Sequence, residues 1–219
     1  MKTALVPKKI LLLFFIFLTG IGFPARLFAA KKTGSSAKMK IYKIDPALSE
    51  FTINTDTKGL FSHIGKNLII AIKDFSGQVQ FSEDSIESGS LKMKVMANSL
   101  TVLNKTKPKD KIKIEQNTQN KVLDSQNFPE ISFESTQVSG KKNEFDFYEV
   151  KIAGNLTLHG VTRPIVINAQ VYLKEGQLMA KGGLAVKQTD YKIKPLTLLG
   201  GAYTVEDQVD LVYQLVAHP

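Results

Sequence analysis

Apolar and polar residues alternate with a period of two along most of the chain after residue 40, which is the pattern of strands that bury one face. Eight such runs can be recognised. Their apolar positions are Phe51, Ile53 and Thr55; Phe75, Gly77, Val79 and Phe81; Leu91, Met93, Val95 and Ala97; Ile131 and Phe133; Tyr148, Val150 and Ile152; Ile165, Ile167, Ala169, Val171 and Leu173; Leu178, Ala180, Leu184 and Val186; Val209, Leu211, Tyr213 and Leu215. About eight amphipathic strands predict an all-β fold, an eight-stranded antiparallel barrel whose interior holds side chains or one ligand.

Short turn signals separate the runs in the middle of the chain. They lie at Ser139–Asn143, at His159-Gly160 and at Lys174–Gln177, and they predict a consecutive antiparallel meander over residues 130–187. Connections this short exclude the crossovers of a parallel sheet. Residues 107–123 break the alternation, and we expect one short helix or lid at 109–123.

The first 30 residues have the pattern of a secretory signal peptide. They hold four basic residues and no acidic one around an apolar stretch, Ile10–Phe23, that is too short for the roughly 20 residues of a membrane span. We expect cleavage near Ala29-Ala30, a flexible basic lead-in at 31–40, a folded domain at 41–219 and a periplasmic or secreted location. Large residues three positions before the cut, Leu27 or Phe28, keep an uncleaved membrane anchor as the alternative.

The charge and the reactive side chains exclude most catalytic classes. Of the net charge of +9, four belong to the leader, so the remaining chain carries +5. The absence of cysteine excludes thiol nucleophiles, disulfides and thiolate metal sites. We expect structural roles for His63 and His159 and a frayed position for His218. The sequence therefore predicts no catalytic residue, no metal and no enzyme, although an activity that uses His63 or His159 stays an alternative.

Five lysines alternate with other residues just before and within the expected helix, at Lys105, Lys107, Lys109, Lys111 and Lys113. Such a basic stretch attracts anionic lipid headgroups or a phosphorylated ligand head. The alternative is a solvated connection that its charge keeps soluble. We expect no nucleic-acid partner, because no aromatic residues interleave with these lysines to stack bases.

Several segments resemble the YceI-like family of exported proteins. The segment Ile152–Pro164 (IAGNLTLHGVTRP) is similar to the signature hairpin of that family, and further similar segments occur in order along residues 41–217. These are Tyr42-Lys-Ile-Asp-Pro46, Phe75-Ser-Gly-Gln-Val79, Phe128-Pro-Glu-Ile-Ser-Phe-Glu-Ser135, Thr189-Asp-Tyr191 and Val205-Glu-Asp-Gln-Val-Asp-Leu211. One departure is Gln188, where the family often has arginine, so no headgroup contact is carried over.

The resemblance implies an extended lipocalin-like β-barrel, covered by a helix, whose long apolar cavity binds polyisoprenoid lipids such as isoprenoid quinones. The chain would hold such a lipid for storage or transport, with no other cofactor, and a membrane surface could be a further partner. The alternative is a packed structural or interaction module of the cell envelope, and the oligomeric state stays open, a dimer included. The residues expected to line the cavity are Phe51, Ile53, Phe75, Val79, Phe81, Leu91, Met93, Val95, Phe133, Ile152, Leu156, Ile165, Ile167, Leu184 and Leu211.

Overall fold

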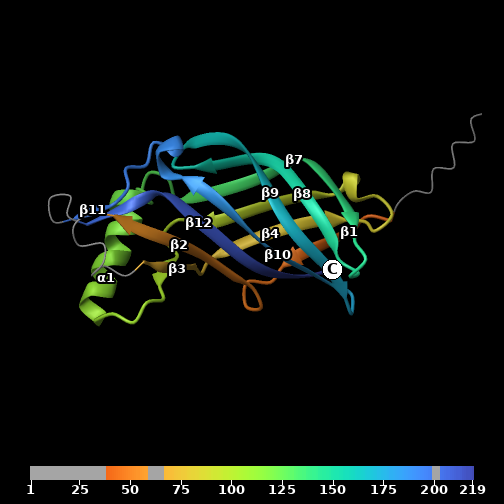
Figure 1. Cartoon of the computed structure of the whole chain (residues 1–219), viewed down its shortest axis with the longest axis horizontal. Coiled ribbons are helices and arrows are strands. Elements are labelled where there is room, and N and C mark those ends of the chain that lie inside the picture. Colours follow the sequence, from red (N-terminus) through yellow and green to blue (C-terminus); the bar gives the residue numbers. More distant parts are fainter. Residues whose placement is uncertain (1–37, 59–66, 199–202) are drawn as a thin grey trace, which may run out of the picture. The chain divides into compact units, whose positions relative to one another are not determined.

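The computed structural model describes residues 38–58, 67–198 and 203–219 (Figure 1). The leader predicted at 1–30, most of the lead-in and His63 lie outside these residues. The strands are β1 (Lys40–Ile44), β2 (Glu50–Lys58), β3 (Ile69–Ile72), β4 (Phe75–Phe81), β5 (Ser90–Met96), β6 (Leu100–Val102), β7 (Glu130–Lys142), β8 (Tyr148–Leu158), β9 (Val161–Lys174), β10 (Gln177–Lys187), β11 (Thr197–Leu198) and β12 (Tyr203–His218). The helical segments are η1 (Ile86–Ser88), α1 (Pro108–Asn117), η2 (Thr118–Val122) and η3 (Gln188–Tyr191).

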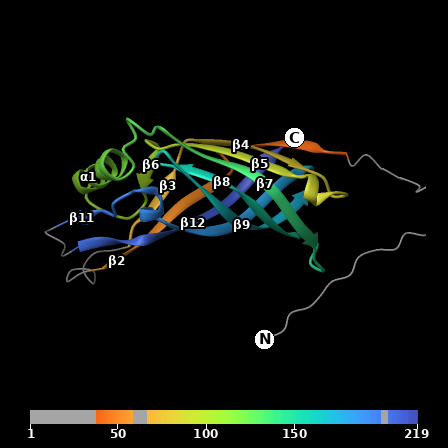
Figure 2. The ribbon, with the colours of Figure 1, turned by 90° about the horizontal axis from the view of Figure 1, so that it is seen from above.

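Eight of these strands close into the antiparallel barrel that the alternation predicts. They follow one another in the order β1-β4-β5-β7-β8-β9-β10-β12, and β1 pairs with β12 to complete the ring. Further along β12, β2 takes the place of β1, and β3 and β6 continue the sheet from β2. The barrel is therefore extended at one end by β2, β3 and β6, which is the end where α1 lies in Figures 1 and 2.

The strand count was correct, but its members differ from the prediction. The first alternating run begins at Phe51 and corresponds to β2, whereas β1 is the strand that closes the ring. No alternating run corresponds to β3, where Ile70, Ala71 and Ile72 are all buried. All four residues of β3 are apolar, the exposed Ile69 included, so the strand has no alternation to recognise.

Two of the three predicted hairpin turns are confirmed. His159 and Gly160 have φ values of 51° and 70°, and Glu175 and Gly176 have values of 52° and 80°. Two consecutive residues with positive φ form the tight turn whose twist matches that of paired strands, and glycine accepts this conformation without strain. These turns set the register of β8 with β9 and of β9 with β10.

The third predicted turn, at Ser139–Asn143, is wrong in its position. Strand β7 runs on to Lys142, and the chain reverses at 143–147, where the Asn143 side chain accepts a hydrogen bond from the Phe145 amide (2.9 Å). Gly140 lies inside β7 and signals a close approach of two strands instead of a turn. A Cβ there would be 2.6 Å from the carbonyl oxygen of Glu149.

The helix predicted at 109–123 is confirmed as α1, which continues as a π-helical turn in η2. Pro108 begins the helix at its first turn, where its missing N–H costs nothing. The helix lies at one end of the barrel, next to β6 (Figures 1 and 2). In the described part of the chain, no helix is long and apolar enough to cross a membrane.

Candidate ligand-binding cavity

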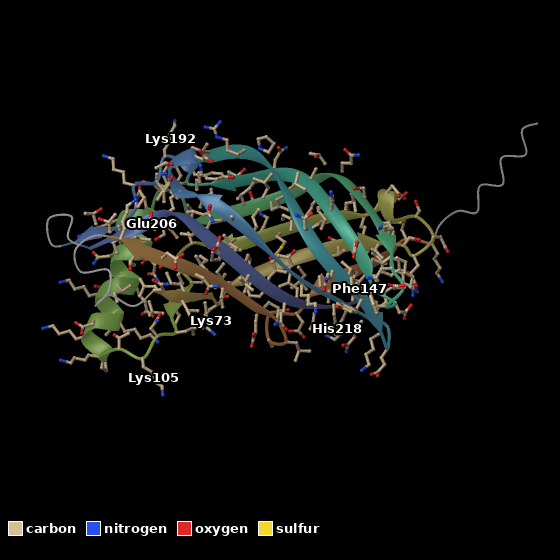
Figure 3. All side chains as sticks on the ribbon, viewed as in Figure 1. Lys73, Lys105, Phe147, Lys192, Glu206 and His218 are labelled. Carbon is tan, nitrogen blue, oxygen red and sulfur yellow. The ribbon has the colours of Figure 1, made fainter. Side chains whose placement is uncertain are left out.

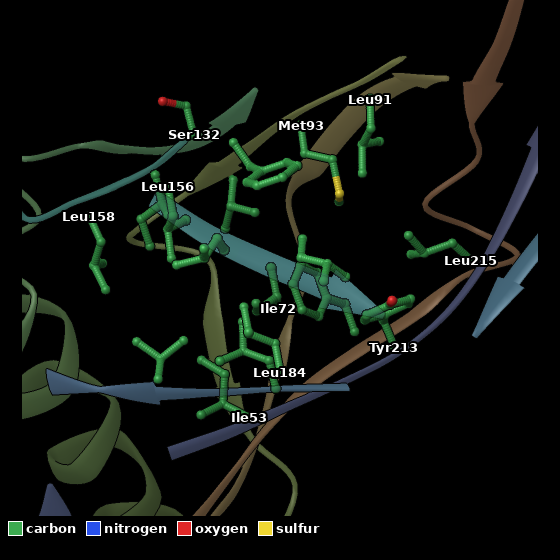
Figure 4. Close-up of a pocket in the computed structure, with 18 of the residues that line it drawn as sticks. Ile53, Ile72, Leu91, Met93, Ser132, Leu156, Leu158, Leu184, Tyr213 and Leu215 are labelled. Atoms are coloured by element: carbon green, nitrogen blue, oxygen red, sulfur yellow. The ribbon is translucent and has the colours of Figure 1, made fainter. Parts of the chain in front are cut away.

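An apolar cavity of about 230 Å³ occupies the interior of the barrel (Figure 4). On the same scale, a single buried water needs only about 10–15 Å³, so the space is much larger than a packing defect. All eight strands of the barrel contribute side chains to its wall, and β2, β3, β6 and η2 complete it. The interior is hollow, which argues against the alternative of a barrel filled by its own side chains.

The cavity extends along almost the whole barrel. Its wall includes Val205 near the start of β12 and Ala217 near its end. At about 3.3 Å per residue this stretch of strand spans about 40 Å, which corresponds to about 30 Å along the axis of a barrel whose strands tilt by about 40°. The shape is therefore that of a long, narrow tunnel.

The structure places fourteen of the fifteen residues expected in the wall at that wall. The fourteen are Phe51, Ile53, Val79, Phe81, Leu91, Met93, Val95, Phe133, Ile152, Leu156, Ile165, Ile167, Leu184 and Leu211. Phe75 is the exception. It is buried, but its ring packs edge-on against that of Phe51, with the ring centroids 5.9 Å apart, and so it supports the wall without lining it.

Sequence reasoning missed a part of the wall that comes from short or non-alternating segments. Ile70 and Ile72 of β3 and Leu100 of β6 face the cavity. So do Val122 and Leu123, which follow the helix. In the sequence, Val122 and Leu123 are two apolar residues at the end of a polar segment. Only the tertiary fold places them against the barrel.

Two polar side chains of the wall, those of Gln188 and Tyr213, are hydrogen-bonded within the protein. Gln188 donates a hydrogen bond from Nε2 to the carbonyl oxygen of Glu206 (2.9 Å), where β12 bulges. The Tyr213 hydroxyl donates to the carbonyl oxygen of Asn168 (3.0 Å), and burial raises the pKa of this phenol above its usual range. With such groups already paired, the wall selects a ligand by shape and apolarity.

The helical segment closes a seam in the barrel wall. No described strand pairs with the second edge of β6. Instead, Glu115 of α1 accepts a hydrogen bond from the Val102 amide (2.8 Å), and Gln119 of η2 donates one to the Leu100 carbonyl (3.1 Å). Two side chains thus form hydrogen bonds with backbone groups of β6 that a neighbouring strand would otherwise bond. The next turn of the helix places Val122 in the cavity wall.

The two histidines that the structure describes have structural surroundings. His159 packs against Phe128, with ring centroids 4.4 Å apart, and its Nδ1 lies 3.3 Å from the carbonyl oxygen of Tyr191. His218 is not frayed, because it continues β12 and lies 3.5 Å from a carboxylate oxygen of Asp45. No group of three or more potential metal ligands is found within residues 38–58, 67–198 and 203–219.

Comparisons with known proteins agree with this architecture. The family model described as "YceI-like domain" matches residues 42–217. A UPF0312 protein of Shewanella baltica is 35% identical over 117 residues, which are 53% of this chain and 56% of that protein. Protein YceI of Salmonella agona is 29% identical over 155 residues, 70% of this chain and 71% of that protein. The chain thus spans just over half the length of the Shewanella relative.

Solved structures share the fold at low sequence identity. BcnA of Burkholderia cenocepacia superposes with a TM-score of 0.64 at 20% identity, covering 79% of this chain and 98% of its own. A polyisoprenoid-binding domain from Saccharophagus degradans superposes with a TM-score of 0.56 at 12% identity, covering 81% of this chain and 97% of its own. At these identities the likeness shows the barrel fold alone.

Proposed function

The chain belongs to the YceI-like family, and from that premise we propose that it binds one long-chain apolar lipid, a polyisoprenoid or an isoprenoid quinone, within the barrel. The observation that carries this proposal is the continuous apolar cavity, to which every strand of the barrel contributes. A polyisoprenoid-binding domain with the same fold supports the choice of lipid class.

The length of the cavity favours a tail longer than an ordinary acyl chain. The hydrocarbon core of a bilayer is about 30 Å thick, and each acyl chain spans about half of it. A tunnel of about 30 Å is therefore roughly twice as long as one acyl chain reaches in a membrane. A polyisoprenoid tail of several units fills such a tunnel in a single extended conformation.

Burial of the tail supplies the affinity. Apolar surface gains roughly 25 cal/mol for each Å² removed from water, so a long tail binds tightly without a strong polar site. Such a protein stores or carries a lipid that water would otherwise exclude. The headgroup would remain near one end of the barrel, since the wall of the tunnel is predominantly apolar and two of its polar side chains are already paired.

The test of this proposal is the content of the purified protein. We expect native mass spectrometry to show one lipid per chain, and solvent extraction followed by mass analysis to identify it as an isoprenoid. A barrel with a blocked interior, described in the Discussion, provides the matched control. Repeated purification of lipid-free protein that also takes up no isoprenoid from detergent micelles would overturn the proposal.

We also propose that the protein is exported and that residues 1–30 are removed. The proposal rests on the four basic residues and the apolar stretch Ile10–Phe23 at the N-terminus. The expected intact mass of the exported protein is that of residues 31–219, and replacement of Ala30 by proline should block the cleavage. A mature protein that keeps Ile10–Phe23 in the membrane fraction would favour the anchor instead.

A further inference from the structure

The outward side of α1 combines lysines with an exposed aliphatic residue. Ile112 and Lys113 each lie three or four residues from both Lys109 and Gln116, so the four residues share one face of the helix. All four are exposed, and Ile112 has 54% of its surface in contact with solvent. The acidic residue Glu115 lies on the opposite face, where it holds β6.

The segment that leads into the helix extends this surface. Leu103 is 51% exposed, and its amide donates a hydrogen bond to the carbonyl of Ile69 (2.8 Å), which is itself 42% exposed. Lys105 and Lys107 follow and are exposed as well. Figure 3 shows Lys105 projecting from the loop before α1, and nitrogen-tipped side chains pointing outward along the helix. We call this surface the α1 face; its members are Ile69, Leu103, Lys105, Lys107, Lys109, Ile112 and Lys113.

The lysines of the α1 face have no carboxylate within 4.0 Å among the residues that the structure places. Lysines elsewhere on the barrel differ in this respect: Lys92 and Lys94 of β5 pair with Glu134 and Glu130 of β7. On the helix itself only Lys111 is paired, with Glu115 at 3.9 Å. The α1 face therefore presents four lysines that form no ion pair with a described residue, around three exposed aliphatic side chains. Their positive charge exceeds the single negative charge of Asp110, which is exposed in the first turn of α1.

The α1 face lies directly over one end of the cavity. The helical segment that carries it also supplies Thr118, Val122 and Leu123 to the cavity wall. Its hydrogen bonds to the edge of β6 come from two side chains, those of Glu115 and Gln119, without a backbone ladder. A partner bound to the α1 face would therefore contact the segment whose inner side closes the seam beside β6.

We propose that the α1 face docks on an anionic lipid bilayer and that the seam between α1–η2 and β6 is the portal through which the tail passes. Lysines near an anionic surface and aliphatic side chains that enter the headgroup region are the two features of interfacial membrane binding. This inference rests on the proposed function, because docking is useful only if the tunnel takes up a lipid from the membrane that it meets. It is tested separately from that function.

The first test uses the absence of cysteine in the chain. One environment-sensitive fluorophore is attached to Ile112→Cys, and in a second protein to Phe145→Cys. Phe145 is 74% exposed and lies in the turn between β7 and β8, away from α1. With vesicles of phosphatidylglycerol and phosphatidylcholine, we expect a blue shift and protection from aqueous quenchers at position 112 only. Equal spectra at 112 and 145, with and without vesicles, would overturn the proposal.

The second test measures the charge contribution in the protein with its own N-terminus. Lys105, Lys107, Lys109 and Lys113 are replaced together by glutamine, and a matched control replaces Lys40, Lys43, Lys141 and Lys151. Each lysine near an anionic surface contributes about fivefold to binding, so we expect the first variant to lose at least about a hundredfold affinity for anionic vesicles at low salt. The control should lose less than about tenfold, and binding to phosphatidylcholine alone measures any contribution of the leader common to both. Equal losses in the two variants would contradict the assignment.

Lipid uptake from detergent micelles separates the two proposals. If the protein takes up an isoprenoid from micelles but position 112 never enters a vesicle, the docking proposal is wrong and the proposed function stands. If vesicles bind at the α1 face but no lipid enters the barrel from either source, the proposed function is wrong. Both proposals predict that the quadruple lysine variant still binds the lipid from micelles, while its uptake from anionic vesicles slows in proportion to the lost affinity.

Discussion

Replacement of Ala169 by phenylalanine is expected to empty the barrel of lipid while the protein stays folded. Ala169 lies in the middle of β9, is buried, and lines the cavity. A phenylalanine ring there would extend into the tunnel and exclude the tail beyond it. Each CH₂ group kept out of the cavity costs about 0.8 kcal/mol of binding free energy, so the loss of five groups lowers the affinity by about a thousandfold.

The matched control is Val166→Phe on the same strand. Val166 is 51% exposed on the outer surface of β9, so a ring there meets solvent and leaves the cavity unchanged. We expect native mass spectrometry to show bound lipid in the wild type and in Val166→Phe, and none in Ala169→Phe. Filling part of a cavity commonly adds about 0.5–2 kcal/mol to stability, so the empty variant should unfold at a denaturant concentration no lower than that of lipid-free wild type. A fully lipid-loaded Ala169→Phe barrel would mean that the lipid binds elsewhere.

Replacement of Gly154 by alanine is expected to cause a large loss of stability from a single methyl group. Gly154 is buried in β8 opposite the bulge of β7, and a Cβ there would lie 2.5 Å from the carbonyl oxygen of Glu134 and 2.5 Å from the ring of Phe133. The ring can turn, but the backbone carbonyl cannot move without breaking the ladder. Overpacking of this kind costs about 3 kcal/mol, which corresponds to a melting temperature lower by about 6–12 °C in a domain of this size.

Gly183→Ala is the matched control, because it is also a glycine within a strand, β10, without positive φ. The nearest atom to a Cβ there is the carbonyl oxygen of Leu211 at 3.1 Å, so a shift of a few tenths of an ångström accommodates it. We expect a change of less than about 1 kcal/mol. Both variants are measured after removal of lipid, since a ligand that binds only the folded state adds to its stability. Equal midpoints for the two variants in denaturant would show that the close approach at Gly154 is not rigid.

Two glycines of one short segment have different structural roles. Gly154 and Gly160 both belong to the segment Ile152–Pro164 that identifies the family in the sequence, but their physical reasons differ. Gly154 avoids a clash between strands, whereas Gly160 has φ of 70° in a tight turn and packs under the ring of Phe128. A turn can be predicted from neighbouring residues, but a close approach of strands cannot. Gly140 was therefore misread as part of a turn.

The alternation of apolar and polar residues was by itself enough to determine the barrel and most of its inner surface. A strand with one buried face records that face at every second residue, which is why thirteen of the fourteen wall residues named in advance lie at alternating positions. The sequence also determined the two tight hairpins and the position of the helix, because their turn residues and breaks in pattern are local. The family resemblance, which the match over residues 42–217 confirms, rests on the same local segments.

Only the tertiary structure decided how the barrel closes and where it is weakest. Which of β1 and β2 pairs with which part of β12 depends on contacts between residues more than 140 positions apart. The seam beside β6 is closed by Glu115 and Gln119. Nothing in the sequence around these two polar residues indicates that they bond a strand edge. The hollow interior is likewise a property of the closed barrel, because the same inward side chains would fill a narrower ring. Local sequence fixes which face of each strand is buried, whereas the number and stagger of strands in the ring fix how much space that face encloses.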